Sequence, residues 1–308
     1  AMALVHLTPV TIDLMRMQFF DTTKFERVVD AAGKKGKGKD YKENSVDVKI
    51  DMPDRYAFLS ASFAVTNEID KGSEKYRWMG NARFTFYTVK LLTGAIPTYR
   101  CDVRYVPWVD ADAKTQLPGG KLLKTEVDSE KPKYPTCSFI QDDCPSCKKA
   151  SDKEDKEGGP REGAGGGAEA FADTEWTKLD NDAFAFLMIC NIPYIAQDML
   201  AAPWAHMSDG AVEIVYIEPK KDPKTGKNLP IERSTFIKVF LDIEDGKHVN
   251  SPDVKYIKAR AVEVIPHDGI TMSDGEVVPS PEVPLAAMRV TPVSHAINLV
   301  RGPIKPQE

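Results

Sequence analysis

The sequence lacks an apolar run long enough to cross a membrane as a helix. Its most apolar stretch, residues 183–190, is followed at once by Asn191 and then by Pro193 and Asp198. A spanning helix needs roughly 20 apolar residues in a row. The first residues also lack the charged and apolar regions of a secretory signal peptide. These absences predict a cytoplasmic protein that contacts membranes only at their surface.

Cysteine and histidine are scarce in this chain. Five cysteines, an odd number, suit a reducing compartment better than a disulfide framework. Cys144 and Cys147 form a lone CxxC with Cys137 nearby, but no histidine lies between His6 and His206 to complete a zinc site. We therefore expect free surface thiols and no metal site, with a metal or redox role as the weaker alternative.

The charge balance gives no reason to expect a nucleic-acid partner. The net charge is −5, from 41 basic and 46 acidic residues, so no overall positive field recruits nucleic acid. With 308 residues and 42% hydrophobic content, the chain can bury a substantial core. We predict one domain over 1–308 with two polar insertions, one rich in Lys and Gly at about 31–45 and one of low complexity at about 110–175.

Alternating apolar and polar residues predict a mainly antiparallel β fold. The clearest case is Tyr99 to Tyr105, where Cys101 and Val103 are expected to face the core. Further strands are expected over 10–15, 46–50, 56–65, 184–190, 210–218, 234–243 and 254–265, separated by Gly and Pro turns. Many short strands of this kind favour a two-sheet β-sandwich.

One long helix is expected over 70–94, with Ser73 as its N-cap and Gly94 at its end. Steps of three and four residues place one set on a common face: Tyr76, Met79, Ala82, Arg83, Phe86 and Val89. Arg83 on a packed face requires an anion, either another side chain or the phosphate of a ligand. Arg77 lies about 120° round the helix, so the two arginines would hold one anion only from its edges.

Five ordered blocks resemble the sphingosine kinases, which belong to the diacylglycerol-kinase-like lipid kinases. Asp70 through Thr85 is similar to the family's DLESEKYRxxGxxRFT block, except that Lys71-Gly72 replaces Leu-Glu. The other four blocks follow in the family's order: 98–100 (TYR), 199–203 (MLAAP), 240–248 (FL...GKH) and 274–276 (DGE). The resemblance implies the C-terminal β-sandwich domain of the diacylglycerol kinase and NAD kinase-like fold.

The resemblance also implies a reaction, the transfer of the γ-phosphate of ATP to the primary hydroxyl of sphingosine or sphinganine, with Mg²⁺. The family's Gly-rich nucleotide loops, which supply the proposed catalytic aspartate, do not occur in this sequence. The catalytic residue is therefore expected outside it. The implied partners are the sphingoid base and a membrane surface, with a homodimer as a further candidate.

By the same resemblance, particular residues receive roles. Asp70 would recognise the sphingoid head, because a carboxylate can bind an ammonium and accept from a hydroxyl. Phe84 and Thr88 would flank the head and upper tail, and Met199 and Leu200 would line the pocket for the tail. The residues expected at the ATP phosphates are Arg77, Arg83, Asp274 and Glu276.

Two alternatives remain open on the sequence. One is a related kinase for ceramide or diacylglycerol, which Asp70 disfavours because a diacylglycerol has no amine. The other is a non-catalytic lipid-binding domain derived from a kinase. For Arg83 alone, an ordinary salt-bridged arginine is the alternative to a phosphate-binding one.

Overall fold

The computed structural model describes residues 8–20, 53–80, 82–108, 176–196, 199–278 and 286–301. Both expected insertions, at about 31–45 and about 110–175, lie outside the described residues. The same holds for Cys144 and Cys147.

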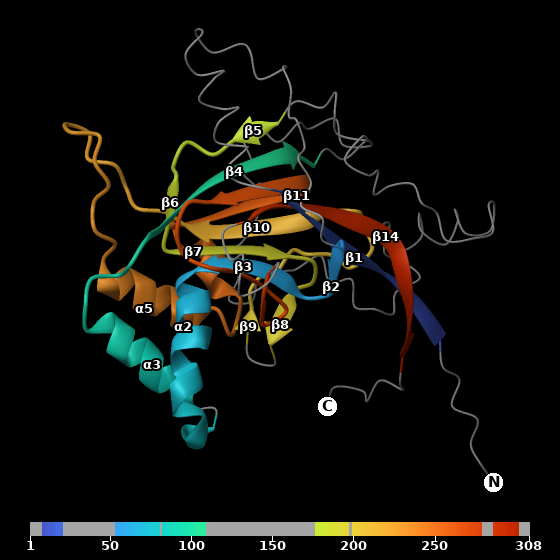
Figure 1. The fold of residues 1–308 in the computed structure, drawn as a ribbon, viewed down its shortest axis with the longest axis horizontal. Helices are drawn as coiled ribbons and strands as arrows, with labels where there is room; N and C mark the ends of the chain where they lie inside the picture. Colours follow the sequence, from blue (N-terminus) through green and yellow to red (C-terminus); the bar gives the residue numbers. More distant parts are fainter. Residues whose placement is uncertain are drawn as a thin grey trace, which may run out of the picture.

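Most strands join one twelve-stranded antiparallel sheet (Figure 1). Along its main path lie β13 (Glu276–Val277), β12 (Thr271–Ser273), β3 (Ser60–Ala64), β7 (Phe186–Cys190), β10 (Val212–Ile217), β11 (Val254–Pro266), β14 (Ala287–Arg301), β1 (Thr8–Phe20) and β2 (Arg55–Ala57). β4 (Tyr99–Pro107) pairs with β11 and also with β5 (Thr177–Lys178) and β6 (Ala183–Phe184). β8 (Tyr194–Ala196) and β9 (Met199–Leu200) form a separate pair.

The sheet curls because the long strand β11 contributes to two layers. Its first half pairs with β10, whereas Val262 to Val264 pair with β14, and β4 runs along its other edge. The curled sheet encloses an inner cluster of buried side chains from both layers, which includes Met15, Phe63, Phe184, Leu187, Ile214, Val264 and Met288. The predicted fold class, mainly antiparallel β with a sandwich-like closure, is confirmed.

Strand β4 confirms the burial predicted from its alternating apolar and polar residues. Cys101, Val103 and Tyr105 are buried, as predicted from their spacing, while Arg104 between them reaches Glu263 on β11. Burial raises the pKa of the Cys101 thiol well above its usual value. The thiol is therefore a neutral core group.

The strand expected over 234–243 is wrong, because this segment forms α5 (Arg233–Asp242). Phe236 and Val239 are buried, and Phe240 packs edge-on against Phe186 of β7. Steps of three and four residues thus put the apolar side chains on one helical face. The short helix η4 (Lys247–Asn250) follows.

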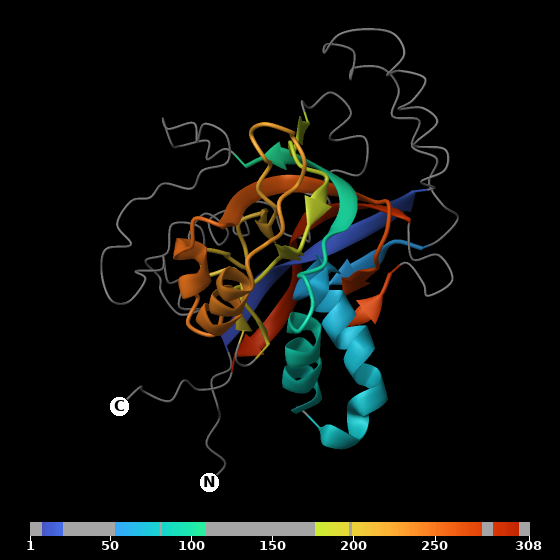
Figure 2. The same cartoon turned by 90° about the vertical axis from the view of Figure 1, so that its left-hand side faces the viewer.

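The single long helix expected over 70–94 is also wrong. The segment folds as a helical hairpin of α2 (Val65–Ser73), η1 (Glu74–Met79) and α3 (Ala82–Leu92), and α2 and α3 lie side by side (Figure 2). Gly80 breaks the helix with a φ of 58°, which favours glycine. Ser73 ends α2 and stands before η1, but its side chain caps neither helix, because its hydroxyl donates to the Asp70 carbonyl oxygen.

This break changes which face of the hairpin is packed. Phe86 and Val89, expected in the core, are 44% and 59% exposed, whereas Tyr87 is buried. A Cβ on Gly72 would lie only 2.1 Å from the Tyr87 ring, so the glycine lets α3 approach α2 closely. The Tyr87 hydroxyl also donates to Glu68 of α2. Gly72, a departure from the family block, is therefore part of the hairpin's packing.

Strand β3 leads directly into α2 through a strained residue. Ala64 has φ 77° and ψ −137°, a combination that costs a non-glycine residue about 1–3 kcal/mol. The next residue, Val65, donates its N–H to Ala185 and is fully buried. This joint sets the direction of the hairpin relative to the sheet.

An outer cluster fills the space between the sheet and the helices. It joins Val65 and Ile69 of α2, Tyr87 of α3, Phe236 of α5 and Phe186 of β7. The molecule therefore has two apolar layers, one within the curled sheet and one beneath the helices.

Candidate functional site

The predicted phosphate-binding arginines lie on either side of the break in the hairpin. Arg77 belongs to η1 and Arg83 to the first turn of α3. Both guanidiniums contact the carboxylate of Glu74, Arg77 at 2.6 Å and Arg83 at 2.9 Å. These contacts lower the pKa of Glu74, with the Arg77 hydrogen bond as the larger cause. Two arginines thus hold one anion, and in this structure the anion is a side chain.

Asp70, the predicted head-group ligand, lies on α2 beside this ion group. Its carboxylate is half-buried and makes no hydrogen bond or ion pair with another described residue. Burial raises the pKa of Asp70, Arg83 opposes that rise, and Glu74 adds to it. A bound cation would relieve the cost of this burial.

The predicted tail residues are only partly brought to this place. Met199 packs against the outer cluster, and Leu200 is buried and hydrogen-bonded through its N–H to Ile243 at the end of α5. Thr88 is half-buried on α3. Phe84 belongs to the same helix, but its side chain is outside the described part of the structure.

The remaining predicted nucleotide residues, Asp274 and Glu276, lie at the opposite end of β3 from the hairpin. The Asp274 carboxylate accepts N–H groups from Phe58, Leu59 and Ser60 at 2.7–3.0 Å. It therefore holds the turn before β3. Glu276 is exposed and lies 3.6 Å from Arg55. The structure does not bring this pair to the two arginines, and contact of either with ATP remains a prediction.

Several residues that support the site carried no functional interpretation in the sequence. Glu68 accepts hydrogen bonds from Tyr87 and from Tyr99, the central residue of the TYR block, and thereby ties α2 to β4. His248 of the GKH block is fully buried and contacts the Ala201 carbonyl of the MLAAP block at 3.0 Å. Burial lowers the pKa of His248 to about 4. In the sequence, only the membership of Tyr99 and His248 in two of the five blocks indicated a role, and nothing indicated one for Glu68.

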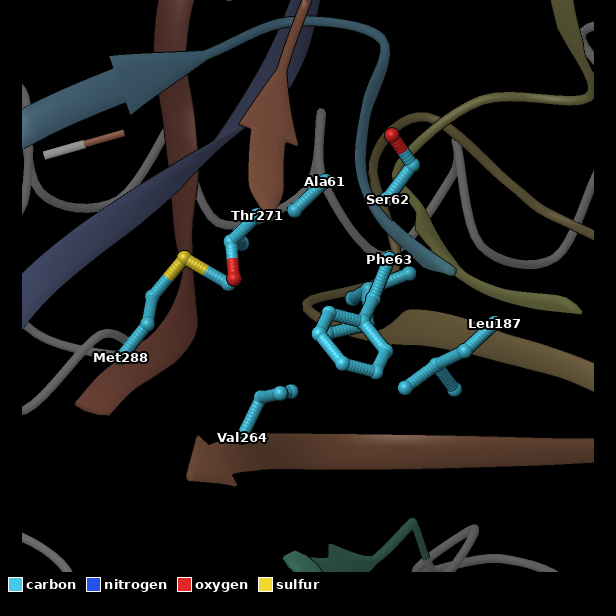
Figure 3. Close-up of a pocket in the computed structure, with 8 residues that line it drawn as sticks. Ala61, Ser62, Phe63, Leu187, Val264, Thr271 and Met288 are labelled. Carbon is cyan, nitrogen blue, oxygen red and sulfur yellow. The ribbon is translucent and has the colours of Figure 1, made fainter. Parts of the chain in front are cut away.

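A small gap, with no room for a water molecule, lies between side chains on the inner side of the curled sheet (Figure 3). It is lined by apolar residues that include Phe63, Leu187, Val264 and Met288, together with Thr271. None of the predicted site residues lines it. We do not assign it a role in the site.

Two absences concern only the described part of the chain. No group of three or more His, Cys, Asp or Glu side chains there is placed to hold a metal ion. In the same residues, no helix is long and apolar enough to span a membrane.

The fold agrees with a known class of domain. Residues 173–300 match the family model described as the YegS C-terminal NAD kinase beta sandwich-like domain. Over most of its length, the chain is similar to the C-terminal portion of the sphingosine kinases.

Two relatives show the extent of this similarity. The chain is 26% identical over 231 residues to sphingosine kinase 2 of Arabidopsis thaliana, a match that covers 72% of this chain and 39% of that protein. It is 24% identical to sphingosine kinase 1 of Homo sapiens, with 74% of this chain and 49% of that protein covered. The chain thus spans less than half the length of these relatives.

The alignment with a solved diacylglycerol kinase from Bacillus anthracis covers 97% of this chain and 55% of the solved chain. The identity is 10% and the TM-score is 0.34, a score too low to carry an argument about the site.

Proposed function

We propose that this chain supplies the lipid-binding half of a sphingoid base kinase, which transfers the γ-phosphate of ATP to the primary hydroxyl of sphingosine or sphinganine. The observation that carries the proposal is the position of Asp70. A half-buried carboxylate without a paired cation among the described residues lies beside two arginines that already hold an anion. A cationic head group and a phosphate could thus be bound side by side.

Asp70 supplies specificity in this proposal. Its carboxylate would bind the ammonium of the sphingoid base and accept a hydrogen bond from a neighbouring hydroxyl. Binding of the ammonium would lower the raised pKa of Asp70. A neutral head group could not do this, so Asp70 disfavours diacylglycerol and ceramide as substrates.

Arg77 and Arg83 would hold phosphate oxygens of ATP, because a guanidinium presents paired donors to such oxygens. Both arginines already contact the Glu74 carboxylate, which supports the proposal that they can bind a phosphate between them. When bound, Mg²⁺ neutralises phosphate charge. From the resemblance to the sphingosine kinases, we propose that the catalytic base is held by a part of the enzyme outside this sequence.

The lipid tail and the membrane would lie on the helical side of the molecule. Met199 borders the outer cluster, where a thioether can adapt to a flexible chain. Trp78, Phe86 and Val89 are 81%, 44% and 59% exposed on the hairpin. Exposed apolar side chains of this kind suit contact with a membrane surface, which supports our proposal of a peripherally bound cytoplasmic enzyme. A homodimer remains a further proposal.

Transfer of labelled phosphate from ATP to sphinganine tests this function. We would compare the 308-residue chain with a form extended upstream, and each with its Asp70→Asn variant. Asp245→Asn is the matched control, because it removes an exposed carboxylate that pairs with Lys247 and has no proposed role in binding. Activity in the extended form only, lost in Asp70→Asn and kept in Asp245→Asn, is the expected result.

Other outcomes would change the proposal. Activity of the short chain would show that no upstream part is needed. Phosphorylation of ceramide or diacylglycerol in preference to sphinganine would contradict the role of Asp70. Binding of sphinganine without transfer in either form would favour a non-catalytic lipid-binding domain.

A further inference from the structure

We propose that Glu74 is an internal stand-in for phosphate, and that a nucleotide binds by displacing its carboxylate from Arg77 and Arg83. The inference rests on the proposed function, because it takes these arginines as the phosphate ligands. It adds a residue for which neither the family match nor the relatives give a role. Glu74 would keep the two guanidiniums in place until phosphate arrives.

The geometry of the ion group supports this exchange. Glu74 and Arg77 are one turn apart on η1, whereas Arg83 lies beyond the Gly80 break on α3. One carboxylate oxygen faces each guanidinium, at 2.6 Å and 2.9 Å. The carboxylate therefore connects the two arms of the hairpin, as a bound phosphate with several oxygens would.

The exposure of the three side chains shows which of them can move. The side chain of Arg83 is 17% exposed, whereas those of Glu74 and Arg77 are 43% and 72% exposed. Tyr76 packs edge-on against Phe86 at 5.0 Å and holds η1 to α3 independently of the charges. Glu74 can therefore swing into solvent while Arg83 and the hairpin stay in place.

The exchange also has an electrostatic consequence for Asp70. Glu74 raises the pKa of Asp70, and Arg83 lowers it. A phosphate in the place of Glu74 would bring more negative charge to the same arginines. The Asp70 carboxylate would then be more costly to keep ionised without a cation, so a nucleotide should strengthen the binding of an ammonium there.

Calorimetry with inorganic tripolyphosphate at low salt tests the inference on the 308-residue chain. The variants are Glu74→Gln, Arg83→Ala and Arg77→Ala, with Asp245→Asn as the control that changes net charge equally elsewhere. We expect Glu74→Gln to bind about two- to fivefold more tightly, because an exposed ion pair no longer competes. Asp245→Asn should match the natural chain, and both arginine variants should bind more weakly.

The outcomes separate the inference from the proposed function. Arginine-dependent binding that Glu74→Gln leaves unchanged or weakens would overturn the stand-in role and keep the phosphate site. Binding that neither arginine variant alters, or no binding at all, would overturn both. Arg77 is largely exposed, so its variant stays informative if Arg83→Ala does not fold.

Carboxyl NMR of Glu74 gives a second readout that a purely structural role would not change. The arginines lower the pKa of Glu74 in the free chain. Saturating tripolyphosphate should raise it back towards the ordinary glutamate value, because the carboxylate is released. A Glu74 pKa that stays low at saturation would contradict displacement.

Discussion

Two groups of three charged residues in this molecule have opposite composition and opposite surroundings. In the hairpin, one carboxylate holds two cations, and the group is open to solvent. In the sheet, the ammonium of Lys258 lies between Asp209 at 2.5 Å and Glu213 at 2.9 Å, and the side chains are 14%, 8% and 2% exposed. A buried charged group must keep its partners, whereas an exposed one can exchange a partner for a ligand.

The sheet group is fixed because removing any member would leave buried charge unpaired. Lys258 of β11 also lies 5.0 Å from the centre of the Trp108 ring, and Glu213 faces it from the neighbouring strand β10. Burial raises the pKa of Glu213 to about 7, although Lys258 opposes that rise. In the hairpin group only Arg83 is largely buried, whereas Glu74 and Arg77 are exposed enough for water or another anion to replace the Glu74 carboxylate. Ligand exchange is therefore expected at the hairpin and not in the sheet.

Replacing Lys258 should give the largest effect. Lys258→Met leaves two carboxylates buried together, so we expect a loss of about 3–5 kcal/mol in the free energy of unfolding. Denaturant unfolding would measure it. Lys255→Met is the control, because Lys255 lies on the same strand but is exposed. Equal stability of both variants would show that the sheet group is not needed for folding.

A side chain at Gly72 tests whether packing, rather than charge, holds the hairpin. Gly72→Ala forces the Tyr87 ring out of its place on α2, and we expect a loss of about 1–3 kcal/mol on unfolding. Gly94→Ala, where a Cβ meets only a carbonyl oxygen at 3.7 Å, should be close to neutral. A neutral Gly72→Ala would mean that α2 and α3 can separate without cost.

The pH dependence of the free energy of unfolding should reveal the raised pKa of Glu213. Its pKa is raised to about 7 in the folded chain, so the folded state binds the proton more tightly than the unfolded state. Protonated Glu213 therefore favours the folded state fully at a pH below its pKa in the unfolded chain, near 4.5. This contribution to the unfolding free energy is lost as the pH rises towards 7. Glu213→Gln should reduce the fall in unfolding free energy between pH 5 and 7 by about 1–2 kcal/mol. An unchanged pH profile from denaturant unfolding would contradict this pKa.

The smallest effect is expected at the hairpin group. Glu74→Gln should shift the melting temperature by less than about 2 °C, because exposed ion pairs contribute little. Thermal unfolding followed by circular dichroism would measure it. A large loss would mean that Glu74 is structural, in which case displacement by phosphate would be unfavourable.

Much of the sheet could be predicted from the sequence, because the two-residue period of a half-buried strand is local. Tyr99 to Tyr105 shows it clearly, and β4 lies where that pattern placed it. The segment of α5 was predicted wrongly because Ile237, Val239, Leu241 and Ile243 alternate as in a strand, although Phe236, Val239 and Phe240 also fit helical steps. Its packing on Phe186, distant in sequence, decides for the helix.

The arrangement of the candidate site could not be predicted from the sequence, and the roles of its residues stay predictions. Spacing alone placed Arg77 and Arg83 on one continuous helix, because the helical period resumes after the Gly80-Asn81 pair at which the chain turns. The sequence did indicate that Arg83 needs an anion. That the anion is Glu74, reached across the turn, depends on how the hairpin folds back and is not contained in the spacing.

The pairing of β1 with β14 has a consequence for how the protein is made. Thr8 lies opposite Arg301, so the first described strand finds its main partner in the last one. During synthesis β1 must wait, with an unpaired edge, until β14 has left the ribosome. Closing so long a loop slows folding. A circular permutant that joins these two strands through a short turn should fold faster, with little change in the final structure.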